Sequence, residues 1–215
     1  MLCLPGHCGF AEMDFRLKIN PSLSWILSWW PDRSILICCK STQGHHVVVQ
    51  KDCVRWSPPV SPMVKVNFDG AVFKDLGKLG IGVVVRDSQR LVLASMSWKI
   101  LLPQSVTDVE AMVAVRFVNF AQDLSLPLII IEVDSENIIK TLCSEDESFS
   151  SYGHLIAEAK LSTVSFYSFC VSHIHRQCNS VARNLARHAR HVSGLMVWIE
   201  DIPPHINSIL LAVFG

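Results

Sequence analysis

Residues 65–73 read KVNFDGAVF, and the predicted fold extends outward from this stretch. Polar and apolar residues alternate up to Asp69, as expected for a β-strand with one buried face. Asp69 and Gly70 then form a pair typical of turns, so we expect the strand to cover residues 64–69. A carboxylate at the end of a strand that otherwise suits a core indicates either a turn or a ligand site.

Downstream of this strand, short β-rich runs with tight links predict an antiparallel meander of three strands. The apolar period then becomes helical, and a nearly continuous apolar run follows, typical of a buried parallel strand. We therefore predict an α/β fold in which helices cover a mixed sheet, with the order β-β-β-α-β-α-α-β-α. After the first strand, the predicted elements are strands at 81–87, 90–100, 126–135 and 165–175 and helices at 105–124, 135–143, 152–162 and 179–191.

The chain has 215 residues, enough for one sizeable domain with an extension. Residues 55–63 (RWSPPVSPM) contain three prolines, which disfavour both a helix and a central strand, so we expect a linker there. Residues 1–54 are predicted to be an irregular N-terminal extension in which only HHVVVQ, at 45–50, has strand character. The folded domain is predicted to span residues 64–215.

Composition argues against several classes of protein. No apolar stretch approaches the roughly 20 residues that a membrane-spanning helix needs, and the first residues do not resemble a secretory signal. The eight cysteines show neither C-x-x-C nor finger spacing, which predicts reduced thiols and no zinc site. We expect a monomer that is intracellular, nuclear or cytoplasmic, and not secreted.

Three acidic residues lie where this layout can bring them together. Asp69 ends the first strand, Glu110 falls in the first turn of the first long helix, and Asp134 ends the run LIIIEVD. Active sites of open α/β sheets favour the carboxyl ends of strands. Each acid also has a structural interpretation: Glu110 in a capping box with Thr107, Asp134 as a helix N-cap, and Asp69 in a turn.

Carboxylates that meet on one edge repel each other unless positive charge lies among them. Hard divalent ions such as Mg²⁺ prefer oxygen ligands and supply that charge. Two such ions about 3.5–4 Å apart can activate water for phosphodiester cleavage. The absence of a side chain at Gly70 would let the backbone beyond Asp69 lie close to a ligand.

From about Trp56 onward the chain resembles the type 1 ribonuclease H domain, and more narrowly its plant reverse-transcriptase-like branch, which is related to non-LTR retroelements. The matching segments are RWSPPVSPMVKVNFDGA, GIGVVVRDSQRLVLAS, TDVEAMVA, IEVDS and HIHRQCNSVARNLARHA. The resemblance implies a five-stranded mixed sheet with three antiparallel strands first and helices on both faces. It also implies hydrolysis of RNA in RNA–DNA hybrids with Mg²⁺ or Mn²⁺, for which Asp69, Glu110 and Asp134 would be catalytic residues and metal ligands.

The chain departs from this pattern at one position. The family has a fourth carboxylate shortly after an R-x-x-N motif, which here is Arg176 to Asn179, and that position holds Arg183. A guanidinium cannot ligate a cation. Arg183 would either pair with Asp69 or Asp134 and displace one ion, or contact the substrate phosphate while the acids still hold metal.

A nucleic-acid surface is not obvious, because net charge is zero and the chain from residue 63 on is mildly acidic. The last helix nevertheless carries Arg183, Arg187 and Arg190 on one stripe, which would suit either a phosphate track or a solvated face. The candidate substrate-binding residues are Arg176, Asn179, Arg183 and Arg187. Asn67, Gln104 and Ser105 are further possible donors.

Three hypotheses on function follow from these residues. The first is a metal-dependent nuclease that acts on RNA–DNA hybrids. The second is a nucleic-acid-binding relic without catalysis, because Arg183 replaces a ligand. The third is a protein-interaction module that uses Trp25, Trp29 and Trp30 in the N-terminal extension.

Overall fold

The computed structural model describes residues 48–50, 55–103, 105–126, 128–136, 138–139, 166 and 168–213. For residues 48–50, 106–108, 110–111 and 168–169 it describes the backbone alone. The tryptophans at positions 25, 29 and 30 lie outside these residues, as do most of the helices predicted at 135–143 and 152–162. Within the described residues, no helix is long and apolar enough to cross a bilayer.

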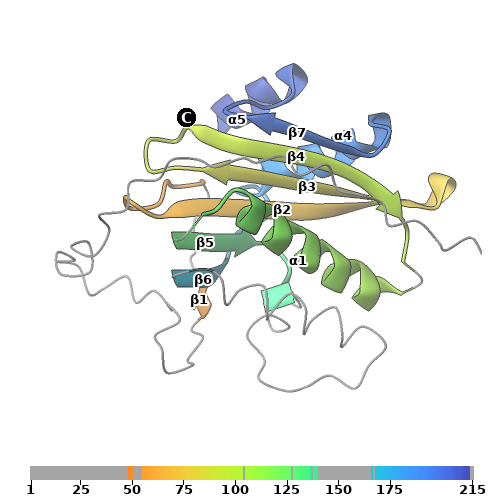
Figure 1. The fold of residues 1–215 in the computed structure, drawn as a ribbon, viewed down its shortest axis with the longest axis horizontal. Helices are drawn as coiled ribbons and strands as arrows, with labels where there is room; N and C mark the ends of the chain where they lie inside the picture. The colour runs from red at the N-terminus through yellow and green to blue at the C-terminus, as the bar shows by residue number, and fades with distance from the viewer. Residues whose placement is uncertain are drawn as a thin grey trace, which may run out of the picture.

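A single mixed sheet forms the centre of the molecule (Figure 1). The order of its strands is β1-β6-β5-β2-β3-β4-β7. The strands are β1 (Val48–Gln50), β2 (Val64–Phe73), β3 (Lys78–Arg86), β4 (Val92–Leu101), β5 (Leu128–Val133), β6 (Ser168–His173) and β7 (Leu195–Ile199). Strands β2, β3 and β4 are antiparallel, whereas β5 is parallel to β2 and β6 is parallel to β5.

The predicted fold class is confirmed, because the five expected strands form this mixed sheet in the expected directions. The described part of the sheet has seven strands rather than five, since a short strand is added at each edge. Strand β1 pairs in parallel with β6 and comes from the segment HHVVVQ. Strand β7 pairs antiparallel with β4 and belongs to the C-terminal tail.

Helices cover both faces of the sheet, as predicted. Helix α1 (Val106–Asp123) packs on the face that carries the even-numbered side chains of β2, where the rings of Phe68 and Phe117 stack with centroids 3.9 Å apart. Helix α4 (Ser180–His188) packs on the opposite face and continues into the 3-10 turn η3 (Ala189–His191). Figure 1 shows α1 in front of the sheet and α4 behind β3 and β4. The tail ends in η4 (Pro204–Ile206) and α5 (Asn207–Ala212).

Two glycines of β3 allow α4 to lie directly on the sheet. A Cβ atom built on Gly82 would lie 2.1 Å from the backbone nitrogen of Ala186, and one built on Gly80 would lie 2.2 Å from the carbonyl oxygen of the same residue. These distances are far below van der Waals contact, so no other residue fits at either position without a shift of the helix. The glycines therefore set how closely α4 lies on β3.

Strand β2 does not end at Asp69, contrary to the prediction. It continues to Phe73, because residues 69–73 keep their antiparallel pairing with β3. What ends is the pairing on the other side: the last residue of β2 that pairs with β5 is Asn67. Asp69 therefore lies inside a strand that has a partner on one edge only.

The predicted linker packs against the domain. The side chains of Trp56 and Met63 are each only 4% exposed. Trp56 belongs to the same apolar cluster as residues of α4 and of the C-terminal tail. Residues 55–63 thus bury apolar surface although their prolines prevent regular secondary structure.

Candidate active site

Asp69 and Asp134 lie close together where β5 ends beside β2. Asn67 pairs with Glu132 in the parallel register; Asp69 lies two residues further along β2, and Asp134 lies just after the last residue of β5. Burial first, and then the negative charge of Asp134, raise the pKa of Asp69 from 3.8 to about 6. The structure thus places two of the three predicted acids together, in a setting that favours extra positive charge.

Asn179 connects this pair to helix α4. Its side-chain amide donates one hydrogen bond to Asp134 Oδ1, at 2.8 Å, and another to the carbonyl oxygen of Phe68, at 2.9 Å. The residue stands at the N-cap position of α4, a position that suits asparagine, but its side chain makes no capping hydrogen bond. Its side-chain oxygen, which would accept such a bond, is buried without a partner among the described residues, while both amide protons connect α4 to β2 and to the end of β5.

Two arginines bring positive charge to the acids. Arg183 and, more weakly, Arg176 lower the pKa of Asp69 and so oppose the effects of burial and of Asp134. Arg183 is half-buried, and its Nε atom is buried without a hydrogen-bond partner among the described residues. Within that part of the chain it forms no ion pair with either acid, so it acts on Asp69 through space.

Glu110 is described by its backbone alone. It lies in the second turn of α1, three residues before Val113, and therefore on the same face of the helix. A Cβ atom built on Gly70 would lie 3.2 Å from Val113 Cγ2, so this face of α1 approaches β2 next to Asp69. Gly70 thus makes room for the helix, whereas the sequence suggested room for a ligand.

The structure bears on the structural interpretations of Asp134 and Asp69, but not on that of Glu110. The hydroxyl oxygen of Ser135 accepts a hydrogen bond from the backbone nitrogen of Ile138 at 3.4 Å, so Ser135 rather than Asp134 serves the helix start there. Asp69 Oδ1 accepts the backbone N–H of Gly70 at 2.8 Å, a local contact that leaves the second carboxylate oxygen for other partners. The side chains of Thr107 and Glu110, which would form the capping box, lie outside the description.

A buried polar cluster lies directly beneath the acids, and sequence reasoning missed it. Glu132 is 3% exposed and receives hydrogen bonds from Trp56 Nε1 at 2.9 Å and Asn67 Nδ2 at 3.0 Å. Lys65 Nζ lies 2.6 Å from Glu132 Oε1. Arg86 is fully buried, donates to Asn67 Oδ1 at 2.6 Å and stacks over the Trp56 ring at 3.6 Å.

This cluster corrects one prediction. Asn67 was a candidate donor to substrate, but it is fully buried and bonded on both sides. A signal for the cluster was present, because Glu132 interrupts an otherwise apolar buried strand and a buried carboxylate needs cationic partners. Burial lowers the pKa of Arg86 to about 9, although the charge of Glu132 acts in the opposite direction.

The arginine stripe of the last helix divides into two parts. Arg190 forms a bidentate ion pair with Asp75, with distances of 3.0 and 2.5 Å. Because Arg190 is paired with Asp75, Arg183 and Arg187 are the residues of the stripe that could contact phosphates of a nucleic acid. Arg187 is exposed. Arg176 is exposed as well and lies just before α4.

The chemistry of the donor set suits a divalent cation at Asp69 and Asp134. Two adjacent carboxylates, one with a raised pKa, are the hard oxygen ligands that Mg²⁺ and Mn²⁺ prefer. The described side chains contain no group of three or more metal-binding residues, and the side chain of Glu110 is not among them. A fourth carboxylate at position 183 would make the site more negative, whereas Arg183 makes it less negative.

Comparison with known proteins agrees with this architecture. The sequence model of the reverse transcriptase-like family matches residues 67–189, more than half of the chain, and the chain belongs to that family. No curated protein is similar enough to the chain to count as a relative.

Solved structures of ribonuclease H proteins share the fold. RNase H1 from Halobacterium salinarum superposes with a TM-score of 0.54 at 21% identity, over 60% of this chain and 98% of that one. The N-terminal RNase H domain of a Mycobacterium tuberculosis protein gives 0.53 at 20%, over 60% and 94%. RNase H1 isolated from compost gives 0.51 at 20%, over 59% and 94%. These similarities identify a ribonuclease H-like fold.

Proposed function

We propose that this protein binds RNA–DNA hybrids across Asp69 and Asp134 and hydrolyses the RNA strand with Mg²⁺ or Mn²⁺. The observation that carries the proposal is the pair of adjacent carboxylates at the end of β5, with the pKa of Asp69 raised to about 6. We further propose that hydrolysis is slow, because Arg183 stands where the family has a fourth carboxylate. The fold and the family membership support the same reaction class.

Each residue has a role in this proposal. Asp69 and Asp134, with Glu110, would hold the cation, which when bound supplies charge to activate water and to stabilise the leaving oxygen. Asn179 keeps the Asp134 carboxylate in place through its 2.8 Å hydrogen bond. Arg183, which forms no ion pair with a described carboxylate, is suited to a backbone phosphate of the substrate.

A second candidate is hybrid binding without hydrolysis, and the position of Arg183 favours it. A permanent cation beside Asp69 competes with a metal ion for the same negative charge. The two candidates agree on the bound ligand and differ only in whether the RNA strand is cut.

A cleavage assay separates them. The RNA strand of a short hybrid is end-labelled and incubated with wild type, Asp69→Asn, Arg183→Asp and the control Arg90→Gln, in Mg²⁺, Mn²⁺ or EDTA. We expect slow cleavage by wild type, a loss of more than about 100-fold in Asp69→Asn, and faster cleavage by Arg183→Asp. Arg90 lies in the β3–β4 turn, so its variant should match wild type.

Fluorescence anisotropy with the same labelled hybrid in EDTA completes the test. Binding without cleavage in every variant and both metals would reject hydrolysis and leave the second candidate. Failure to bind the hybrid at all would reject both.

The cysteines and the fold also bear on compartment and assembly. We propose an intracellular compartment, nuclear or cytoplasmic, because the spacing of the eight cysteines shows no disulfide framework. We propose a monomer, which size-exclusion chromatography with light scattering would check.

A further inference from the structure

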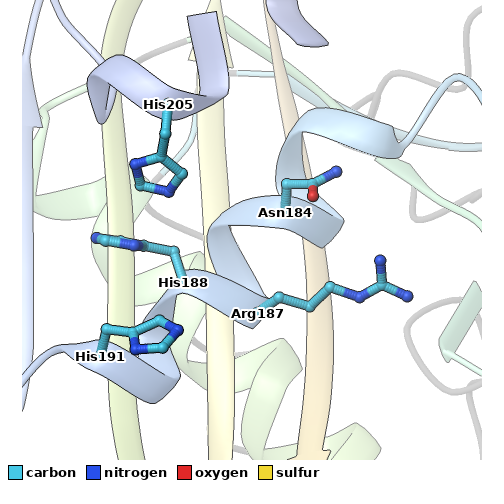
Figure 2. Close-up of a pocket in the computed structure, with 5 residues that line it drawn as sticks. All are labelled: Asn184, Arg187, His188, His191 and His205. Carbon is cyan, nitrogen blue, oxygen red and sulfur yellow. The ribbon is translucent and has the colours of Figure 1, made fainter.

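A second polar pocket lies on α4, one turn beyond Arg183. It has a volume of about 440 Å³ and is lined by Asn184, Arg187, His188, His191 and His205. Figure 2 shows the three imidazoles one above another, with His188 between His205 and His191. The ring centroid of His188 lies 4.5 Å from that of His205 and 6.3 Å from that of His191.

No acidic side chain is among the described residues that line this pocket. Among the elements packed around it, η3, η4, β7 and α5 contain no Asp or Glu. Two charged side chains of neighbouring elements have other partners. Asp75 pairs with Arg190, and Lys99 Nζ of β4 donates a hydrogen bond to the carbonyl oxygen of Arg190 at 3.1 Å. Glu200 and Asp201, which follow β7, are not among the lining residues.

The imidazoles disfavour positive charge on one another. Burial, together with His205 and His191, lowers the pKa of His188. Its remaining ring neighbour is Trp198, with centroids 5.7 Å apart, which brings no charge. His188 therefore favours its neutral form, and a bound anion would offset the repulsion that disfavours its charged form.

We propose that this pocket binds a phosphate group, held by Arg187 and by an imidazole of the cluster that takes up a proton from solvent on binding. Arg187 lines the same pocket. Figure 2 shows its guanidinium extending from α4 away from the imidazoles, and this exposed, flexible side chain can turn toward them to share a phosphate. The Asn184 amide already donates to the carbonyl oxygen of Ser180 at 2.8 Å, so it is a minor contributor.

The lining favours an anion over a metal ion. Arg187 carries a permanent positive charge and would repel a cation, while the described lining includes neither a carboxylate nor a thiolate to attract one. In the part of the chain that the structure describes, no three histidines or acids have the geometry of a metal site. Protonated imidazole and guanidinium are both strong donors to phosphate oxygens.

Position suggests where the phosphate comes from. Arg183 and Arg187 are separated by four residues, which is about 6 Å along the helix, and stand on one face. A nucleic-acid backbone that passes Asp69 and Arg183 would bring a neighbouring phosphate to Arg187 and the imidazoles. This assignment to a backbone phosphate rests on the proposed function, whereas the phosphate site itself does not.

The first experiment titrates inorganic phosphate into the full chain and follows histidine side-chain signals by NMR at pH 6.5, with chloride at equal ionic strength as the reference. We expect saturable shifts for His188, His191 and His205, and none for His173 and His175, which lie outside the pocket. Arg187→Gln and His205→Gln, both at exposed positions, should weaken binding by about 3- to 10-fold. An absence of shifts, or shifts caused by Zn²⁺ but not by phosphate, would overturn the proposal.

The second experiment identifies the source of the phosphate. Hybrid binding is measured by anisotropy in EDTA at pH 6 and pH 8, in an Asp69→Asn background, because protonation of Asp69 would also strengthen binding at low pH. We expect tighter binding at pH 6, and a ratio between the two pH values that falls toward one in His205→Gln but not in the control Arg90→Gln.

The outcomes separate the two proposals. A response to inorganic phosphate with an unchanged pH ratio in His205→Gln would assign the pocket to free phosphate groups and overturn the backbone assignment. A response to phosphate in a chain that binds no hybrid would reject the proposed function and leave the phosphate site standing.

Discussion

The side-chain amide of Asn179 lies 2.8 Å from Asp134 Oδ1 and donates a hydrogen bond to it. The two residues are 45 positions apart, and the same amide group also binds the carbonyl oxygen of Phe68, next to Asp69. One side chain at the start of α4 thus fixes the end of β5 relative to β2. The geometry of the acid pair depends on this helix as much as on the strands that carry the acids.

The variant Asn179→Ala should destabilise the protein by about 1–3 kcal/mol, because it leaves a buried carbonyl and a carboxylate without their donor. Urea denaturation followed by circular dichroism measures this loss. Asn184→Ala is the matched control, since its amide donates to a helix carbonyl at a half-buried position and should cost less than about 1 kcal/mol. Equal losses in the two variants would contradict the bridging role.

The stability of the protein should depend on pH through Asp69. Its pKa is about 6 in the folded protein and 3.8 without the fold, so the folded state binds the proton more tightly. The resulting stabilisation is complete below about pH 4 and is lost as the pH rises through 6, where the folded protein must carry the charge. Asp69→Asn removes that charge and keeps an oxygen acceptor for the N–H of Gly70.

We therefore expect Asp69→Asn to raise the free energy of unfolding by about 1–3 kcal/mol at pH 8, and by much less at pH 4. Urea titrations in EDTA at the two pH values measure the difference. Glu200→Gln, at an exposed acid, should show no such dependence. A constant effect of Asp69→Asn across this range would show that the carboxyl has an ordinary pKa.

The buried cluster beneath the acids should be sensitive to its charge balance. Glu132→Gln leaves Lys65, which is 6% exposed, without its carboxylate partner and should cost about 3–5 kcal/mol. Adding Lys65→Met removes the uncompensated cation, so the double variant should recover part of that loss. Denaturation of the two single variants and the double variant forms a thermodynamic cycle, and strictly additive losses would contradict the ion pair.

The close contact between β3 and α4 predicts a strong effect of one methyl group. Gly82→Ala places a Cβ atom 2.1 Å from the backbone nitrogen of Ala186, so α4 must shift, at a cost of about 1–3 kcal/mol or more. Gly194→Ala is the control, because no atom lies within 4 Å of a Cβ atom built there. Thermal unfolding should show a clear drop for the first variant only.

Much of the architecture was predictable because apolar periodicity reports local burial. The antiparallel strands, the long helix α1 and the buried strand β5 appear where the pattern placed them, and Asp69 and Asp134 meet as expected. The edge strand β7 was not foreseen, since the tail has no distinctive alternation and pairs with β4 through its backbone. The end of β2 was misjudged because Asp-Gly is common in turns, whereas here it continues its pairing with β3.

The sequence by itself determined the class of fold and the acids that share one edge, because both follow from periodicity and from the order of the elements. Only the tertiary structure decided how Asn179, Arg183 and the cluster around Glu132 surround those acids. Hydrogen bonds and charge effects of this kind depend on distances between residues far apart in the chain. These distances are set only when the sheet and α4 pack together, so the local sequence does not predict them.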